Sequence, residues 1–184
     1  MRHWLPALVV GGLLAAAPAA AGEVGIRCAR TCEVSIGGRL EDGDFKVFHD
    51  YAAAQRITRV ALTGPGGKVA PALAIGQEIR ARGIETVVPE GRRCASACAL
   101  IWLAGTRRLL APGAAIGFHA ISVTQPGQGT AETHAFDDVL VRYLAALGYT
   151  TDITATIVNT PSATIHWRDA LELNANGIAT EALQ

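Results

Sequence analysis

Apolar residues along the chain alternate between short continuous runs and longer segments with a helical period. The continuous runs predict buried strands at Arg59–Leu62, Glu85–Val88 and Ala114–Phe118. Helical spacing predicts four helices: Phe45–Arg56, a segment from Val69 to Gly83, Cys94–Leu103 and Ala131–Leu147. Strands that alternate with helices of this length are typical of βαβ crossovers and a mainly parallel sheet, so we predict an α/β fold.

The two ends of this pattern add smaller elements. Cys28–Ile36 has the pattern of an edge strand. Asp169, followed three residues later by Glu172, forms a capping-box pattern that predicts the last helix, which Gly177 ends. Because no internal repeat, linker or low-complexity tract divides the rest of the chain, we predict one domain over residues 22–184.

The first 21 residues carry the pattern of an export signal. Arg2 gives a short basic start, Trp4–Ala17 is nearly all apolar, and Ala19–Ala21 offers the small residues that a signal peptidase requires. The apolar stretch is shorter than the roughly 20 residues that span a bilayer, although a retained anchor is the alternative interpretation. We predict a signal peptide at 1–21 and a periplasmic or secreted domain that has no membrane association after cleavage.

The composition narrows the function classes. Half of the residues are hydrophobic, and 17% are charged, which is below the roughly 25% of ordinary soluble domains and argues against disorder. Sixteen basic residues balance sixteen acidic ones. This balance gives no electrostatic footprint for nucleic acid or for an anionic membrane surface, so neither is predicted as a partner.

The four cysteines form two pairs with the same spacing, Cys28 with Cys32 and Cys94 with Cys98. In an exported protein they are candidates for disulfides, and four cysteines allow three pairings that sequence alone does not distinguish. Zinc is the competing interpretation, but the spacing within each pair is one residue longer than in the usual zinc knuckle, and no histidine pair accompanies them. We therefore predict neither a metal site nor a cofactor.

Three features that carry chemistry follow predicted strands, where the sites of parallel sheets lie. In Gly64–Gly67 the absent side chains let backbone N–H groups face a ligand. Ser96 stands between two alanines at a predicted helix start, where the helix dipole and free N–H groups stabilise a developing oxyanion. His119 comes directly after another strand. Together they supply the parts of a nucleophilic site.

In this order, the glycine turn, the serine between small residues and the histidine after a strand resemble the proteolytic subunit of Clp protease. The likeness extends over about Ile36 to Thr180 and is greater to exported bacterial relatives with a C-x-S-x-C segment, here Cys94–Cys98. It implies a ClpP/crotonase-like α/β domain, a spiral of βαβ units with helices flanking a mainly parallel sheet. It also implies a serine peptidase that acts on a peptide or protein substrate. A homo-oligomer is an option that the sequence leaves open.

The resemblance assigns a role to each matching residue. Ser96 would be the nucleophile that forms an acyl-enzyme, and His119 the general base that takes and returns its proton. The backbone amides of Gly67 and Ala97 would form the oxyanion hole. The separation of Ser96 and His119 along the chain is also close to that in the family.

The third member of the triad is where this sequence departs from the family. The family's catalytic aspartate would fall near Thr164 or Ile165, and neither residue is a carboxylate. Thr164, Ser162 or a backbone carbonyl are the candidates for orienting His119. Two acids are close along the chain, Asp152 and Asp169.

The resemblance also bears on the cysteines. In a helix, residues four apart have Cβ atoms about 5–6 Å apart, beyond the roughly 4 Å that a disulfide requires. Cys94 can therefore bridge Cys98 only from a position before the helix, which the family likeness implies by starting the helix at Ser96. We expect this bridge to clamp the nucleophile turn and Cys28–Cys32 to close a terminal loop. A free Cys94 or Cys98 as nucleophile is the alternative.

Other functions are open at this stage. A protein that has lost activity would bind a peptide or a partner protein in the same cleft, and the absent acid favours this interpretation. Crotonase-type acyl-thioester chemistry is a third option on the shared fold, disfavoured because export separates the chain from coenzyme A. A serine–lysine dyad has little support, since Lys46 and Lys68 are the only lysines in the sequence. Ser96, His119 and the glycine turn also have purely structural interpretations, as packing, strand-end and turn residues.

Overall fold

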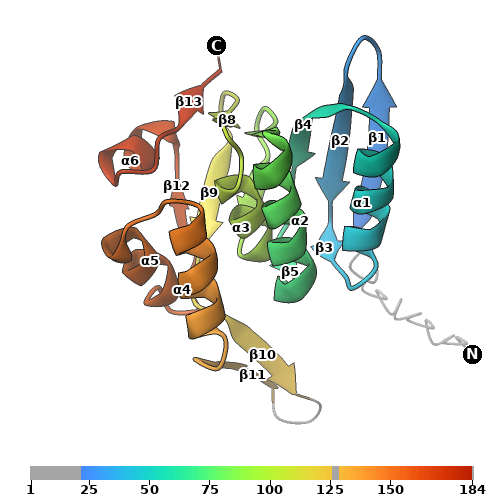
Figure 1. Ribbon diagram of the computed structural model, residues 1–184. Helices are drawn as coiled ribbons and strands as arrows, with labels where there is room; N and C mark the ends of the chain where they lie inside the picture. Colours follow the sequence, from blue (N-terminus) through green and yellow to red (C-terminus); the bar gives the residue numbers. More distant parts are fainter. Residues whose placement is uncertain (1–21, 126–128, 184) are drawn as a thin grey trace, which may run out of the picture.

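The computed structural model describes residues 22–125 and 129–183 as an α/β fold (Figure 1). The predicted export signal at 1–21 lies outside the described residues. The main sheet has the strand order β1-β2-β4-β6-β8-β13, with bounds Glu23–Cys28, Cys32–Gly37, Ile57–Leu62, Glu85–Val88, Arg108–Leu110 and Glu181–Ala182. Each neighbouring pair from β2 to β13 is parallel, and β1 runs antiparallel at one edge. The mainly parallel sheet predicted from the sequence is confirmed.

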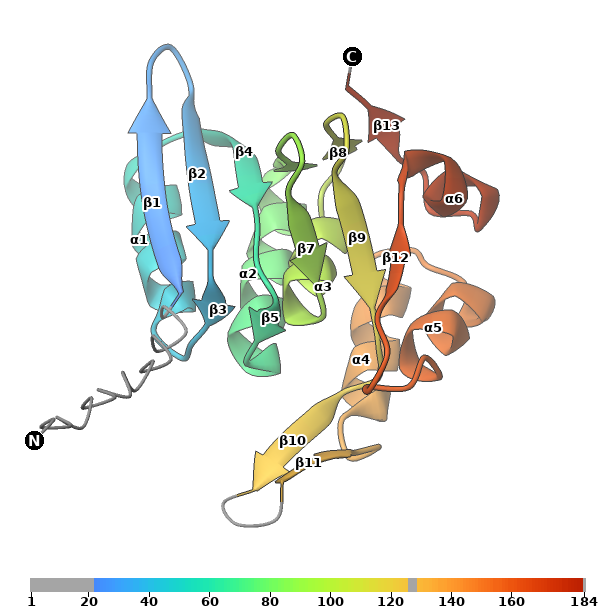
Figure 2. The same cartoon turned by 180° about the vertical axis from the view of Figure 1, so that it is seen from behind.

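Three helices cover one face of this sheet: α1 (Asp44–Ala54), α2 (Val69–Arg82) and α3 (Ala97–Leu103). Figure 2 shows the strands in front of these helices when the molecule is viewed from behind. The core between the layers includes the fully buried side chains of Phe48, Ile75 and Trp102. Every residue of α3 is buried, as its continuous apolar sequence requires. The helix that follows the candidate nucleophile is therefore enclosed on all sides.

Four short strands continue strands of the main sheet and form a second layer. Directly after β2, β4, β6 and β8 come β3 (Arg39–Leu40), β5 (Gly66–Gly67), β7 (Arg93–Ala95) and β9 (Ala115–Phe118). β3 pairs with β5, and β9 lies between β7 and β12 (His166–Arg168). β7 and β9 are parallel, whereas β12 is antiparallel to β9. The carboxyl ends of the main strands are thereby gathered into one region.

The C-terminal part of the chain packs beside this region. It contains α4 (Asp137–Ala146), α5 (Thr151–Val158) and α6 (Ala170–Ala175). The hairpin of β10 (Ser122–Gln125) and β11 (Gly129–Glu132) projects from the body in both views. Asp169 and Glu172 form the predicted capping box at the start of α6. Across the described ranges, no helix has the length and apolar character needed to cross a membrane.

Three predicted elements differ in the structure. Cys28–Ile36 is not a single edge strand, because Cys28 and Cys32 face each other at the turn of the β1–β2 hairpin. Cys94–Leu103 is not a single helix, since β7 takes its first residues and α3 begins at Ala97. Ala131–Leu147 contains the end of β11 before α4 begins. In the first case the chain reverses within the predicted strand, and in the other two strand pairing with a separate segment overrides the local apolar pattern.

Candidate active site

Ser96 lies at the sharp turn between β7 and α3. Its φ is 56° and its ψ is −126°, and it is the only non-glycine residue with positive φ in the described part of the chain. Such a conformation costs about 1–3 kcal/mol, which the surrounding structure must offset. The Ser96 N–H donates to the Gly117 carbonyl at 2.9 Å, and the Ser96 carbonyl accepts from the Leu100 N–H at 3.2 Å. A strained serine between a strand and a helix is typical of an exposed nucleophile.

The glycine turn packs directly against the serine turn. The Gly64 N–H donates to the Arg93 carbonyl at 2.9 Å, and the Gly64 carbonyl accepts from the Ala95 N–H at 3.0 Å. Gly66 has φ 94°, and a Cβ at this position would lie 2.8 Å from the Ser96 Cβ. Because real Cβ atoms do not approach so closely, only glycine at position 66 lets the two turns meet.

A disulfide spans the serine turn. Cys94 in β7 and Cys98 in α3 are bonded, their Cα atoms are 5.4 Å apart, and both side chains are buried. Because Cys94 is in a strand, the pair avoids the helical geometry that would hold the Cβ atoms too far apart. The second disulfide, Cys28–Cys32, joins β1 to β2. Since the described residues include no free cysteine, the alternative of a cysteine nucleophile does not apply to this structure.

His119 reaches the same region from the neighbouring strand. In the parallel pair β7–β9, Ala95 lies opposite Gly117, so Ser96 and His119 follow the carboxyl ends of adjacent strands. The His119 Nδ1 lies 2.7 Å from the Ala120 carbonyl oxygen. Because a carbonyl can only accept, Nδ1 carries the hydrogen in the neutral ring and Nε2 keeps its lone pair. This is the tautomer that a general base requires.

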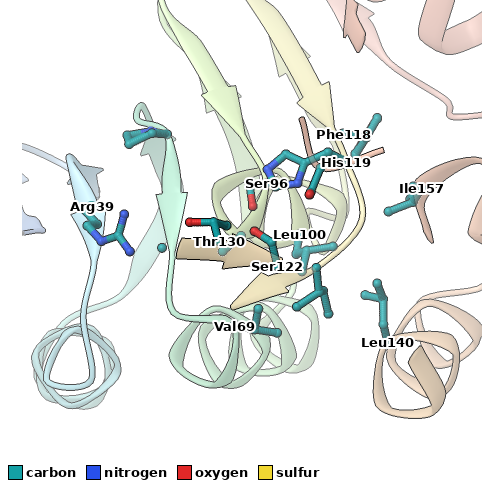
Figure 3. A pocket seen from close by; sticks show the side chains of 15 residues that line it. Arg39, Val69, Ser96, Leu100, Phe118, His119, Ser122, Thr130, Leu140 and Ile157 are labelled. Atoms are coloured by element: carbon teal, nitrogen blue, oxygen red, sulfur yellow. The ribbon is translucent and has the colours of Figure 1, made fainter. Parts of the chain in front are cut away.

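Ser96 and His119 line one pocket of about 430 Å³. Figure 3 shows their side chains in its middle, with Arg39 at one end and Leu140 and Ile157 at the other. No hydrogen bond between described residues joins the Ser96 hydroxyl to the imidazole. Catalytic contacts of this kind often tighten only in the complex with substrate. The structure thus brings the two predicted side chains into one space.

The predicted oxyanion hole consists of two backbone N–H groups, and the local backbone indicates the direction of each. Across the β3–β5 pair, the Lys68 N–H donates to the Leu40 carbonyl at 3.0 Å. Successive peptide groups in a strand face opposite sides, so the Gly67 N–H faces away from β3. Ala97 is the first residue of α3, where an N–H has no acceptor within the helix. Gly67 and Ala97 both line the pocket beside Ser96.

The group behind His119 is a backbone carbonyl. Thr164, the predicted orienting residue, donates its hydroxyl to the Pro161 carbonyl at 3.2 Å and does not line the pocket. Ser162 does line the pocket. Among the candidates that the sequence leaves open, the carbonyl, here that of Ala120, is the one that contacts Nδ1. The position that matches the family's aspartate does not bring the Thr164 hydroxyl to the imidazole, because its turn directs that hydroxyl to the Pro161 carbonyl.

The charged residues that could have assisted Ser96 or His119 form contacts with other residues. Asp169 caps α6, and Lys46 bonds Asp50 at 2.6 Å. Lys68 forms a hydrogen bond with Asp42, which raises the pKa of the Lys68 ammonium above its ordinary value. A lysine held in its charged form cannot abstract a proton from a serine. A serine–lysine dyad is therefore not supported.

Comparison with known proteins gives structural relatives only. No protein-family model and no curated protein sequence matches the chain. A serine-to-alanine mutant of the 1510-N membrane-bound stomatin-specific protease is similar, with a TM-score of 0.63 and 18% identity over 82% of this chain and 77% of that chain. A lysine-to-alanine mutant of that protease, in complex with a substrate peptide, gives 0.60 and 20% identity over 82% and 73%. Pseudomonas aeruginosa PA4980 gives 0.56 and 14% identity over 87% and 77%.

These similarities extend over most of the chain. The chain has the Clp protease-like fold. At these identities the likeness concerns the fold, and it confirms the ClpP-like architecture that the sequence resemblance implies. In this chain the Clp protease-like fold gathers the ends of successive parallel strands around the pocket that contains Ser96.

Several pocket residues of this Clp protease-like fold have no sequence motif. The apolar lining comes from separate elements: Leu100, Phe118, Ile121, Leu140 and Ile157. Their periodicity identifies them only as core residues. Arg39 was detectable in principle, because it lies two residues after β2, near the carboxyl end of a parallel strand, where functional residues gather.

Proposed function

We propose that this chain is a serine hydrolase, specifically a peptidase, with Ser96 as nucleophile and His119 as general base. The observation that carries the proposal is the strained turn at Ser96, whose side chain shares one pocket with His119. The similarity in fold to a stomatin-specific protease supports the peptide bond as the target.

The proposed reaction needs only groups that border the pocket. His119 Nε2 takes the hydroxyl proton while the Ser96 Oγ attacks the substrate carbonyl carbon, and the N–H groups of Gly67 and Ala97 stabilise the oxyanion. The imidazolium then gives its proton to the leaving amine as the C–N bond breaks, and the acyl group stays on Ser96. Water, deprotonated by the same imidazole, hydrolyses the ester and frees the serine.

The neutral acceptor behind His119 sets the expected rate. In a serine protease, replacing the orienting aspartate with asparagine lowers kcat about 10⁴-fold, because the imidazole takes the wrong tautomer. Here the Ala120 carbonyl keeps the correct tautomer but supplies no negative charge to stabilise the imidazolium. We therefore expect turnover below that of a complete triad and above that of a variant without the imidazole.

The second candidate function is peptide binding without turnover. It is favoured by the same observation, since the His119 Nδ1 contacts a carbonyl where a triad would have a carboxylate. The pocket would then hold a peptide or partner protein by its apolar end. The reactivity of Ser96 separates the two functions.

A fluorophosphonate probe on the purified chain tests the proposal. Wild type should be labelled, and mass spectrometry should find the adduct on Ser96. Ser96→Ala should abolish labelling, and His119→Ala should slow it roughly 10²–10⁴-fold. Ser35→Ala, which changes an exposed serine of β2, is the control and should label like wild type. Labelling that survives Ser96→Ala, or a folded wild type that does not react, would contradict the proposal.

We also propose that the chain is exported, with a signal peptide at 1–21 and a single mature domain at 22–184. The two disulfides support an oxidising compartment such as the periplasm or the exterior. The mass of the protein recovered from that compartment should correspond to a chain that starts near Gly22. A mature protein that retains Met1 would contradict cleavage.

A further inference from the structure

The pocket around Ser96 has two chemically different ends. At one end lie Leu140 and Ile157, both almost fully buried. At the opposite end lies Arg39, with Ser96 and His119 between the two ends (Figure 3). A substrate whose carbonyl carbon is at Ser96 would therefore extend toward both ends. The part on one side of the cleaved bond would lie at the apolar end, and the part on the other side would lie at the Arg39 end.

Arg39 directs its side chain to the pocket from a fixed backbone. In β3 the neighbouring Leu40 is 2% exposed and packs in the core, so the alternating Arg39 faces the other side. β3 pairs with Gly66 and Gly67 of β5, and Gly66 packs against the serine turn. The Arg39 side chain itself is 57% exposed. Its backbone is thus held in register with the nucleophile while its guanidinium stays accessible.

The acids near Arg39 do not saturate it. The Glu41 carboxylate lies 3.6 Å from the Arg39 Nε, which is longer than a hydrogen bond, and among the described residues no hydrogen bond engages the guanidinium. Glu41 lies at the same distance, 3.6 Å, from the Lys68 Nζ, and Lys68 also bonds Asp42. The lysine therefore balances much of the acidic charge, and the outer edge of the guanidinium stays open.

Among the described residues that line the pocket, the one permanent charge is the positive charge of Arg39. Of the described lining residues, Arg39 and His119 are the titratable ones, and no acidic side chain is among them. Such a lining attracts a carboxylate and repels an ammonium group. The planar guanidinium also matches a carboxylate with two parallel hydrogen bonds.

We propose that Arg39 is a specificity-determining residue that binds a carboxylate of the substrate on the side of the cleaved bond opposite to the apolar end. This inference rests on the proposed function, since it takes Ser96 as the point of attack. The carboxylate belongs to a peptide, as an acidic side chain or as the free C-terminus.

Two matched series of alkyl fluorophosphonates test the inference with the full chain. In each series the alkyl chain becomes longer step by step. One series ends in a carboxylate, and the other ends in a carboxamide of the same shape. At the best length, the carboxylate probe should label Ser96 of the wild type roughly fivefold faster. R39A should remove this preference, and R39K should keep part of it, because lysine retains the charge without the planar fork. E41Q, which removes the competing acid, should keep or increase the preference.

The outcomes separate this inference from the proposed function. Equal labelling of the wild type by both series at every length overturns the role of Arg39 and leaves Ser96 as the nucleophile. A preference that persists in R39A also overturns it. A folded wild type that reacts with neither series overturns the proposed function, and the inference falls with it.

Three competitor peptides distinguish the two sources of the carboxylate. All are based on one glutamine-containing sequence. The first is the capped peptide, the second is the capped peptide with glutamate scanned along it, and the third is the glutamine peptide with a free C-terminus. Stronger protection of Ser96 by a glutamate peptide assigns an acidic side chain, and stronger protection by the free C-terminus assigns a chain end. In R39A this advantage should disappear. Equal protection by all three peptides in the wild type overturns the inference.

Discussion

Single residues with left-handed backbone surround the candidate nucleophile. Gly64, Gly66 and Gly67 have φ of 135°, 94° and 142°, and Ser96 has φ 56°. Glycine adopts such conformations without a steric cost, whereas serine does not. The conformation of Ser96 is therefore imposed by the turns around it. Substitution of the neighbouring glycines should change the position of the Ser96 hydroxyl.

Gly66→Ala should impair Ser96 because the serine turn must move. The new Cβ would lie 2.8 Å from the Ser96 Cβ and 2.7 Å from the Ala95 carbonyl oxygen. We expect about 10²-fold slower fluorophosphonate labelling, and a free energy of unfolding lower by roughly 2–4 kcal/mol. Gly83→Ala is the matched control, because Gly83 has φ 70° and open space around its Cβ position. It should lose about 1 kcal/mol of stability and label at the wild-type rate. A Gly66→Ala variant that labels normally would contradict this account.

The site residues that the sequence predicts are those with a local signature. Ser96 stands between alanines after a predicted strand, and His119 follows an apolar run, so each was identified without knowledge of the other. Their meeting depends on the parallel pairing of β7 with β9, which the alternation of strands and helices indicates only in outline. Thr164 has no such signature. The direction of its turn decides whether its hydroxyl faces the pocket, and spacing along the chain does not encode that direction.

At the scale of elements, β7 and α3 show where local patterns fail. Cys94–Leu103 consists of small and apolar residues, so its pattern predicts a helix from the first residue. In the structure Cys94 pairs with Ile116 of β9 and bridges Gly64, which holds the first residues in an extended strand. The start of α6 was predictable, because a capping box is satisfied within four consecutive residues. Elements fixed by partners close in sequence are predicted well, and those fixed by distant strands are not.

The disulfide of the serine turn should matter for reactivity more than for the fold. A closed loop this short contributes about 2 kcal/mol through chain entropy, so C94A/C98A should remain folded. Without the bridge between β7 and α3, we expect roughly tenfold slower labelling of Ser96. C28A/C32A is the matched control, with the same separation of four residues in the β1–β2 hairpin. It should lose comparable stability and no labelling. Equal labelling by the two double variants at matched circular dichroism would show that the Cys94–Cys98 bridge does not position the serine.

At the scale of the whole molecule, charges tie the C-terminal strand to the sheet. Arg107 donates to Glu181 of β13 at 2.8 Å and to Glu85 of β6 at 3.2 Å. Arg59 of β4 donates to the same Glu85 at 2.6 Å. Exposed pairs contribute little one by one, but these four residues form a continuous network across the sheet edge. The network reaches β13, which is an edge strand of the main sheet and pairs with β8 in the described part of the chain.

Glu181→Gln should destabilise the chain in a pH-dependent way. Its hydrogen bonds with Arg107 lower the pKa of Glu181 below the ordinary value. A carboxyl whose pKa is lower in the folded state stabilises the fold above its unfolded pKa, and this contribution is lost as pH falls through the folded pKa. The Tm of the variant should therefore be below that of wild type at neutral pH, and the difference should vanish in acid. Glu33→Gln, which changes a carboxylate without a hydrogen bond or ion pair among the described residues, is the control. A Tm difference that is unchanged in acid would contradict the network.

The carbonyl that contacts His119 has a consequence for the time course of the proposed reaction. An imidazolium without a neighbouring negative charge is a costly intermediate in both acylation and deacylation. With a reactive ester as substrate, acylation is fast, so deacylation, in which the imidazole must activate water, becomes the slower step. The covalent intermediate should then accumulate, and rapid mixing should show a burst close to one equivalent of product before slow steady release. Quenched during that interval, the protein should carry the acyl group of the ester on Ser96, and the mass of that adduct would reveal which residue forms the covalent bond.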